Sequence, residues 1–300
     1  MEILAIAALV PVIVLMVLIY RADKADKEPV KLIVLTLVLG ALSCIPAVII
    51  EVIYDMVAGS VAPAAYEAQS VGYLFFEYFL GVALVEEFCK GGAMMLAVWK
   101  KDDFNYVFDG IVYCAAAALG FAGLENLTYV LDPTLGGVDT AVARGILSVP
   151  GHCSFGIAMG YFVGRAKFQK YAGNKARMKQ LLLLGLLVPT AMHGAYDFGL
   201  SVNDATGLAA IGAAFAFDIA AIVYVKKGAK NDVPIRIPQK APRQPYVPPQ
   251  QPYVPPQAQV QPQPQTRPVA PVRKPVAKFC PNCGAPNAGG AFCPHCGNKF

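Results

Sequence analysis

The sequence predicts an all-α integral membrane protein, and three observations lead to this fold class. Apolar residues make up 56% of the chain, and the mean hydropathy is positive although the last part is strongly polar. Seven apolar stretches are long enough to cross ~30 Å of hydrocarbon, which takes about 20 helical residues. These stretches lack the alternation of barrel strands, and unpaired backbone amides are costly in lipid. We therefore expect a bundle of seven membrane-spanning helices.

The seven predicted spans fill the first three quarters of the chain. They cover residues 2–20, 31–54, 72–99, 106–131, 140–164, 180–200 and 206–225. The first span has neither a basic segment before it nor a small-residue cleavage site after it. We therefore expect it to be retained as a helix rather than removed as a signal peptide.

The loop charges predict the orientation of the bundle, because cytoplasmic loops collect Lys and Arg. Basic residues follow spans one, three, five and seven: Arg21, Lys24, Lys27, Lys31, Lys100, Lys101, Arg165, Lys167, Lys170, Lys175, Arg177, Lys179, Lys226, Lys227 and Lys230. The alternate loops contain acidic residues but no Lys or Arg. We expect a multi-pass protein of the cell membrane with its N-terminus outside and its C-terminus in the cytoplasm. The net charge of +5 is a signal of topology here and gives no reason to expect nucleic acid as a partner.

A polar linker is predicted after the membrane domain of residues 1–230. Residues 231–276 contain 14 of the 24 prolines, and the heptapeptide QPYVPPQ occurs twice in tandem, at 244–250 and 251–257. Such a composition cannot pack a core and favours an extended polyproline II conformation. We expect a disordered spacer. A docking site for a proline-recognising partner in the cytoplasm is the alternative.

The last segment, residues 277–300, is predicted to bind a structural metal ion. It contains two C-x-x-C pairs, each followed by Gly, and their four thiols come from Cys280, Cys283, Cys293 and Cys296. Two such knuckles place four thiolates around Zn²⁺ at about 2.3 Å. A cytoplasmic location disfavours disulfides. We expect a small zinc ribbon that serves structure or a cytoplasmic partner rather than catalysis.

Ionisable residues inside the spans are the candidates for function, because each costs roughly 3 kcal/mol or more at the bilayer centre. They lie on spans three to seven: Glu86, Glu87, Lys90, Asp109, Glu125, Arg144, His152, His193, Asp197 and Asp218. We expect structural or peripheral roles for three of them. Asp109 offsets a helix dipole, Arg144 extends outward to the interface, and Asp218 stands alone in its span.

The spacing of the remaining residues indicates how they cooperate. Glu86 and Lys90 are four residues apart and therefore lie on one helix face, whereas Glu87 points about 100° away from Glu86. We expect one glutamate to face the reaction and the other to support it. His193 and Asp197 repeat the four-residue spacing, so the carboxylate can orient the imidazole.

These motifs resemble those of a known family. EEFCK at 86–90 is similar to the E-E-x-x-K signature of the PrsW family of intramembrane proteases, and FAGLEN and HGAYD resemble its second and third motifs. The resemblance covers about residues 70–200, and the family is similar to the CAAX prenyl proteases and bacteriocin-processing enzymes. It implies a peptidase that uses Glu86, Glu87, Lys90, Glu125, His152, His193 and Asp197. It also implies membrane-tethered substrates such as anti-sigma factors.

The chemistry leaves two mechanisms open. Peptide hydrolysis needs an activated water, a proton donor and stabilisation of an oxyanion, all of which buried glutamates and histidines can supply. A catalytic metal ion is the alternative, because Glu86, Glu125, His152 and His193 are credible ligands. The chain has no H-E-x-x-H helix motif, and we therefore favour a water activated by glutamate without metal.

Two other classes of function fit part of the pattern. A transporter or an ion-conducting protein also buries Glu, His and Asp along its path, but the chain shows no internal repeat of the kind found in transporters. An inert scaffold that presents the zinc ribbon is the third possibility. The set of acidic and imidazole groups argues against it.

Overall fold

The structure, a computed structural model, describes residues 2–237, 278–286 and 289–299. The chain divides into a membrane unit and a C-terminal unit, which are described separately. Most of the predicted linker, with both QPYVPPQ repeats, lies outside the described residues. Described residues 232–237 belong to the membrane unit, which thus extends beyond the predicted boundary at residue 230.

The membrane unit is helical, as predicted. Its helices are α1 (Glu2–Ala22), α2 (Val30–Leu42), α3 (Cys44–Val61), α4 (Pro63–Glu67), α5 (Val71–Phe76), the π-helical stretch η1 (Glu77–Ala83), α6 (Leu84–Val98), α7 (Asp109–Leu131), α8 (Val138–Ile146), α9 (Ser148–Tyr171), α10 (Lys175–Val202) and α11 (Asp204–Lys230).

Six of the described helical segments are long and apolar enough to cross a membrane: α1, α2 with α3, α7, α8 with α9, α10 and α11. The seventh predicted span corresponds to α5, η1 and α6, which follow one another from Val71 to Val98. This stretch concentrates Glu77, Glu86, Glu87 and Lys90. Seven spans and their orientation therefore stay predictions.

Local sequence explains where several helices break. Pro46 has no backbone amide for the carbonyl of Leu42, so α2 and α3 are separate helices. The Asn203 side chain accepts a hydrogen bond from the Thr206 amide, and the Thr206 hydroxyl accepts one from the Asn203 amide. This capping box ends α10 and starts α11.

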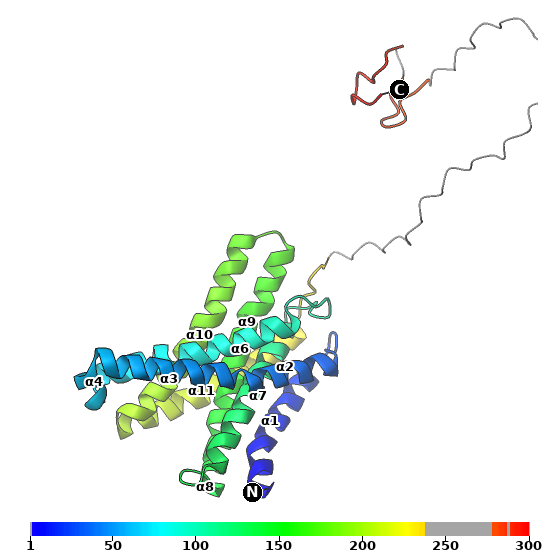
Figure 1. Cartoon of the computed structure of the whole chain (residues 1–300). Coiled ribbons are helices and arrows are strands. Elements are labelled where there is room, and N and C mark those ends of the chain that lie inside the picture. The colour runs from blue at the N-terminus through cyan, green and yellow to red at the C-terminus, as the bar shows by residue number, and fades with distance from the viewer. Residues whose placement is uncertain (1, 238–277, 287–288, 300) are drawn as a thin grey trace, which may run out of the picture. The chain divides into compact units, whose positions relative to one another are not determined.

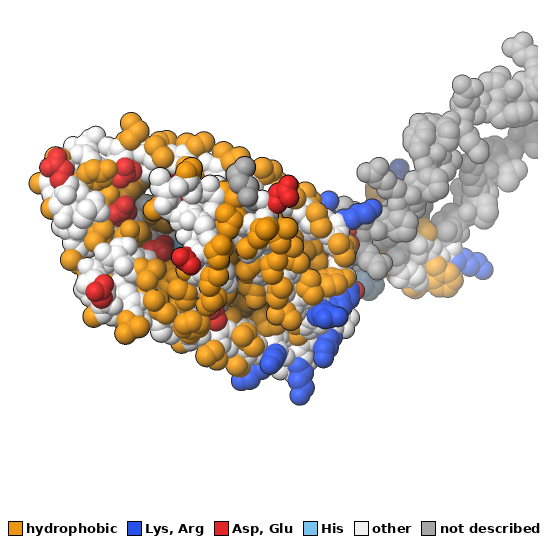
Figure 2. All heavy atoms as spheres, turned by 90° about the horizontal axis from the view of Figure 1, so that it is seen from below, with side chains coloured by type: hydrophobic (Ala, Val, Ile, Leu, Met, Phe, Trp, Pro, Cys, Tyr) orange, Lys and Arg blue, Asp and Glu red, His pale blue; other side chains and the backbone are white. Residues whose placement is uncertain are grey.

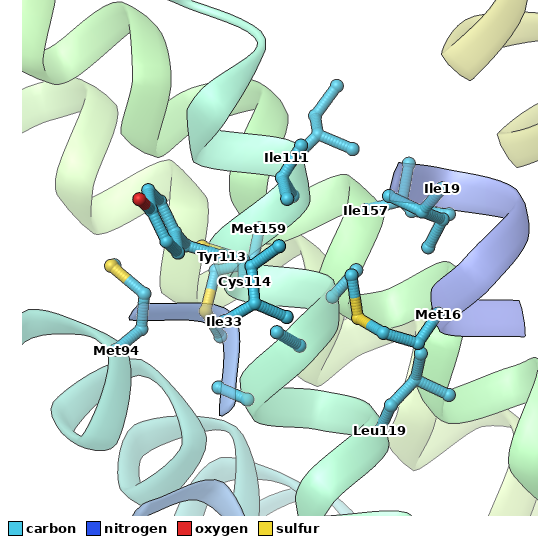
Figure 3. Close-up of a cluster of buried hydrophobic side chains, with 14 of the residues drawn as sticks. Met16, Ile19, Ile33, Met94, Ile111, Tyr113, Cys114, Leu119, Ile157 and Met159 are labelled. Carbon is cyan, nitrogen blue, oxygen red and sulfur yellow. The ribbon is translucent and has the colours of Figure 1, made fainter. Parts of the chain in front are cut away.

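Helix α7 occupies the centre of the bundle, with α1, α2, α6 and α9 beside it (Figure 1). In its most apolar stretch 83% of the residues are buried, against 22% for α1 and for α11. Side chains of α7 pack with those of α1, α2, α6 and α9 to form the core (Figure 3). They include Met16, Ile19, Ile33, Met94, Ile111, Tyr113, Cys114, Leu119, Ile157 and Met159. The outer helices leave many Ile, Leu and Val side chains exposed, as expected for surfaces that face lipid.

Figure 2 shows one broadly apolar face, with Lys and Arg gathered toward one end and Asp and Glu toward the other. This separation of charge accords with the loop pattern on which the predicted orientation rests.

Glycines allow α7 to pack against its neighbours with almost no space between the backbones. A Cβ atom added at Gly120 would lie 2.0 Å from the carbonyl oxygen of Leu37 on α2, and one at Gly164 of α9 would lie 1.9 Å from that of Val107. Small residues at such crossings are typical of membrane helices.

Substitution of Gly120 by Ala is therefore expected to destabilise the protein by about 1–3 kcal/mol, since the backbone of α2 must move to admit a methyl group. Thermal unfolding in detergent measures the effect. Gly212 of α11 is the matched control, because an added Cβ meets no atom within 4 Å there. Equal stability of the two variants would contradict this description of the α2–α7 crossing.

Candidate functional site

A cavity of about 810 Å³ lies within the membrane unit, in the size range of ~300–1,000 Å³ typical of ligand sites. Its apolar wall includes Ile45, Val48 and Ile49 of α3. Seven ionisable side chains also line it: Glu51, Glu86, Glu125, Arg144, His152, His193 and Asp197. Five of these belong to the predicted catalytic set, so the structure brings residues of α6, α7, α9 and α10 to one cavity.

Lys90 and Glu87, the other two residues of the predicted set, are buried and do not line the cavity. The Lys90 ammonium is 1% exposed and donates to Glu86 Oε2 at 2.9 Å, to Glu87 Oε1 at 2.8 Å and to His152 Nδ1 at 2.9 Å. All three of its protons are thereby used. A buried charge needs such compensation, so this ammonium holds two carboxylates and one imidazole in place. Glu86 lines the cavity and Glu87 does not, and which of the two faces the reaction stays a prediction.

The two histidines lie side by side, with ring centroids 5.2 Å apart. An ammonium can only donate, so Nδ1 of His152 accepts and its Nε2 proton points to Glu125 Oε2, 2.8 Å away. His193 has a carboxylate at each nitrogen, Glu87 at 3.1 Å from Nδ1 and Asp197 at 3.1 Å from Nε2. The predicted pairing of His193 with Asp197 is thus present.

Arg144 corrects one expectation, because it does not extend outward to the interface. Its Nη2 lies 3.0 Å from Glu125 Oε1, and its Nε donates to Asn126 Oδ1 at 3.0 Å. The guanidinium also lies over the Tyr129 ring. Arg144 lies within α8 (Val138–Ile146), and both of these contacts are made to α7. The side chain therefore belongs to the site.

Two other ionisable residues of the spans, Asp109 and Asp218, do not line the cavity, whereas Glu51 does. Asp109 accepts hydrogen bonds from the amides of Asn105 and Tyr106 at the start of α7, which fits its expected structural role. Asp218 accepts a hydrogen bond from Ser154 outside the cavity. Glu51 of α3 lines the cavity and is absent from the predicted set, although an ionisable residue within span 31–54 is itself a signal of function.

The donor set of the cavity fits a metal ion. Glu86, His152 and His193 each offer one ligand atom, and these atoms all lie within 4.8 Å of one another. Two imidazoles and one carboxylate are a ligand set of hydrolytic zinc sites. The Lys90 ammonium contacts two of the three residues, so an ion bound here would have this ammonium beside it.

The described part of the C-terminal unit forms two matching knuckles. The amides of Cys280 and Cys293 donate to the carbonyls of Ala285 and Asn298, and each knuckle turns through a glycine with positive φ. Sγ atoms of opposite knuckles, Cys280 with Cys296 and Cys283 with Cys293, are 3.7 Å apart. Tetrahedral Zn²⁺ with bonds of about 2.3 Å requires about 3.8 Å between sulfurs. The four cysteines can therefore hold a metal ion together, and His295 is exposed beside them.

Comparison with known proteins gives a family match and several named relatives. Residues 28–225 match the family model described as "PrsW family intramembrane metalloprotease". The chain is 36% identical over 202 residues to "Protease PrsW" of Geobacillus kaustophilus (strain HTA426), a match that covers 67% of this chain and 81% of the relative. It is 35% identical over 196 residues to "Protease PrsW" of Bacillus subtilis (strain 168), covering 65% and 81%.

No solved structure shows significant similarity. The family match extends beyond residues 70–200, where the sequence motifs lie, and takes in α2, α3 and most of α11. It contains every ionisable residue that lines the cavity. The chain is a member of the PrsW family of intramembrane proteases.

Proposed function

We propose that the protein cleaves peptide bonds of membrane-tethered proteins inside the cavity that Glu86 lines. The observation that carries this proposal is the convergence of Glu86, Glu125, His152 and His193 on one cavity among membrane helices. Burying these groups in a bilayer is costly, so a cavity that gathers them favours chemistry on a substrate within the membrane. Proteins similar to anti-sigma factors are the substrate class that the sequence motifs imply.

Glu86 is the residue that activates the attacking water. Its carboxylate lines the cavity, and Lys90 orients it from behind. His193 lies on the same wall, with Nε2 3.9 Å from Glu86 Oε2 and 3.1 Å from Asp197 Oδ2. It serves as the proton donor to the leaving amine, a task that suits an imidazole. The Arg144 guanidinium, which holds Glu125, lies at the cavity to offset developing negative charge.

A metal-dependent mechanism is the second candidate, favoured by the ligand set of Glu86, His152 and His193. A metal ion held there would lower the pKa of a bound water and polarise the substrate carbonyl. In this mechanism Glu125 and Lys90 act on His152, which they contact through its two ring nitrogens.

Metal content separates the two mechanisms. The zinc ribbon must first be removed as a source of metal, by replacing Cys280, Cys283, Cys293 and Cys296 with Ser in the full-length protein. Glutamate chemistry predicts an active protein without bound transition metal that resists a strong chelator. One metal ion per chain, lost together with activity in His193→Ala, would establish the metal-dependent mechanism instead.

Arg144→Ala is expected to lower kcat/KM for a membrane-tethered reporter about 10-fold, which corresponds to ~1.4 kcal/mol. The reason is the loss of its charge-assisted contacts with Glu125 and Asn126. Arg144→Lys should recover part of the activity, because it keeps the charge without the forked geometry. Unchanged kcat/KM in a folded Arg144→Ala protein would remove Arg144 from the site.

Substrates are found by comparing the membrane proteomes of cells that produce the wild type with cells that produce Glu86→Gln. A true substrate accumulates uncut in the variant and yields a fragment in the wild type.

The predicted topology, with the tail in the cytoplasm, is tested on the same cells by protease accessibility of a tag after residue 300. We propose that the tail presents the zinc ribbon, or the proline-rich linker, to a cytoplasmic partner.

A further inference from the structure

A second group of buried carboxylates lies outside the catalytic cavity. Asp23, Glu28 and Asp109 are 1%, 2% and 0% exposed, and one carboxylate oxygen from each lies within 4.8 Å of the others. The three residues come from separate segments. Asp23 directly follows α1, Glu28 lies in the loop before α2, and Asp109 is the first residue of α7. None of them lines the cavity of Glu86.

Several oxygen atoms of this acidic cluster have no hydrogen-bond partner. By hydrogen-bond geometry both oxygens of Asp23 and Oδ1 of Asp109 are buried without a partner, and the Asp109 and Glu28 carboxyl groups lie close enough to share a proton. Oδ2 of Asp109 accepts the amides of Asn105 at 2.8 Å and Tyr106 at 2.7 Å, which fixes the carboxylate with its other oxygen toward the cluster. Tyr113, whose ring belongs to the core (Figure 3), donates its hydroxyl proton to Glu28. Buried polar atoms are normally satisfied, so the unpartnered oxygens of Asp23 favour a bound cation at this cluster.

The surrounding charges do not neutralise the cluster. No salt bridge among the described residues involves Asp23, Glu28 or Asp109. Lys27 and Lys167 are the nearby cations, but the Lys27 ammonium donates to the Tyr20 carbonyl and that of Lys167 to the Lys101 carbonyl.

Further acidic groups add to the negative charge, since Asp26 and Asp232 both act on Asp23. Burial, together with these neighbouring carboxylates, raises the pKa of Asp23 to about 6 and that of Glu28 to about 7. The Lys27 ammonium and the Ala25 amide lower the pKa of Asp23 only in part.

We propose that Asp23, Glu28 and Asp109 bind one hard divalent cation, Ca²⁺ or Mg²⁺. Carboxylate oxygens are the ligands that these ions prefer, and two oxygens on opposite sides of an ion are about 4–5 Å apart at the usual bond lengths. The cluster contains no imidazole or thiolate, which softer transition metals favour. The ion would supply the positive charge that the cluster lacks.

The proposed role of this cation is to hold three segments of the chain together at one end of the bundle. It ties the end of α1 and the loop before α2 to the start of α7, the helix at the centre of the fold (Figure 1). Glu125 lies 16 residues further along α7, which is about 24 Å along the helix axis. The site therefore acts on stability rather than on the reacting atoms.

The test uses the full-length protein in detergent after removal of divalent ions. Ca²⁺ and Mg²⁺ are each titrated by calorimetry, and thermal unfolding is recorded with and without the ion. We expect one saturable site for the preferred ion and a higher Tm when it is bound. Asp23→Asn should weaken binding at least tenfold and abolish the rise in Tm. Because the Asp23 carboxylate accepts no hydrogen bond by geometry, this variant should be at least as stable as the wild type in the absence of the ion.

Two control variants locate the ion. Glu67→Gln removes an exposed carboxylate on α4 and should bind as the wild type does. Glu86→Gln should also bind normally, which shows that the ion is not in the catalytic cavity and separates this proposal from the proposed function. The absence of saturable binding in the wild type, or equal affinity in Asp23→Asn, would overturn the proposal. In either case the carboxylates carry protons instead.

Discussion

Replacement of Glu86 by Gln is expected to lower the rate of peptide-bond cleavage ~100-fold or more while the protein stays folded and inserted. The amide has nearly the shape of the carboxylate, and its oxygen can still accept a hydrogen bond from Lys90. It cannot take a proton from water, and general base catalysis contributes typically ~10²–10⁴-fold. The change therefore removes the chemistry and leaves most of the packing.

The measurement is single-turnover cleavage of a membrane-tethered reporter in proteoliposomes. Glu67→Gln, which alters an exposed glutamate of α4 that does not line the cavity, serves as the control and should cleave at the wild-type rate. Thermal unfolding confirms that both variants are folded. A Glu86→Gln protein that cleaves like the wild type would exclude Glu86 as the base and as a required metal ligand.

Replacement of Lys90 by Met is expected to destabilise the protein by about 3–5 kcal/mol, the usual cost of removing one partner from a buried ion pair. Lys90 pairs with both Glu86 and Glu87, at 2.9 and 2.8 Å, and Glu87 is fully buried. Without the ammonium, these two buried carboxylates lose the cation that they share. Thermal unfolding in detergent and the yield of inserted protein measure the loss.

A double variant shows whether charge is the cause. Lys90→Met combined with Glu87→Gln removes one negative charge along with the positive one, and we expect it to recover part of the lost stability. Coupling energies between residues in contact are typically ~0.5–3 kcal/mol. If the double variant were as unstable as the sum of the two single changes, packing rather than charge would be the function of Lys90.

The sequence predicts the helical fold, and it singles out the candidate site residues, because both follow from local signals. Apolar length marks the spans, and an ionisable residue inside a span is rare enough to be a signal by itself. The i,i+4 spacing also places Glu86 with Lys90 and His193 with Asp197. The contacts of Lys90 with His152 and of Glu87 with His193 join different helices, so they depend on how α6, α9 and α10 cross.

Other features have no local signal. Arg144 of α8 reaches Glu125 because α8 packs beside α7, and hydropathy does not show which helices lie side by side. The π-helical stretch η1 depends on backbone bonding that side-chain periodicity does not reveal. Residues 232–237 follow the last predicted span and fall in the predicted linker, yet the Phe108 amide donates to the Asp232 carboxylate and Ile235 is buried. Only the folded chain brings these segments together.

The glycine contacts around α7 also limit the routes by which a substrate can reach the cavity. Parting α7 from α2 or from α9 would separate backbones that touch directly at Gly40, Gly120 and Gly160. The α3 wall has no such restraint, because Ile45, Val48 and Ile49 are each more than half exposed on a helix that starts anew after Ser43. We therefore expect a substrate that enters from the bilayer to pass beside α3.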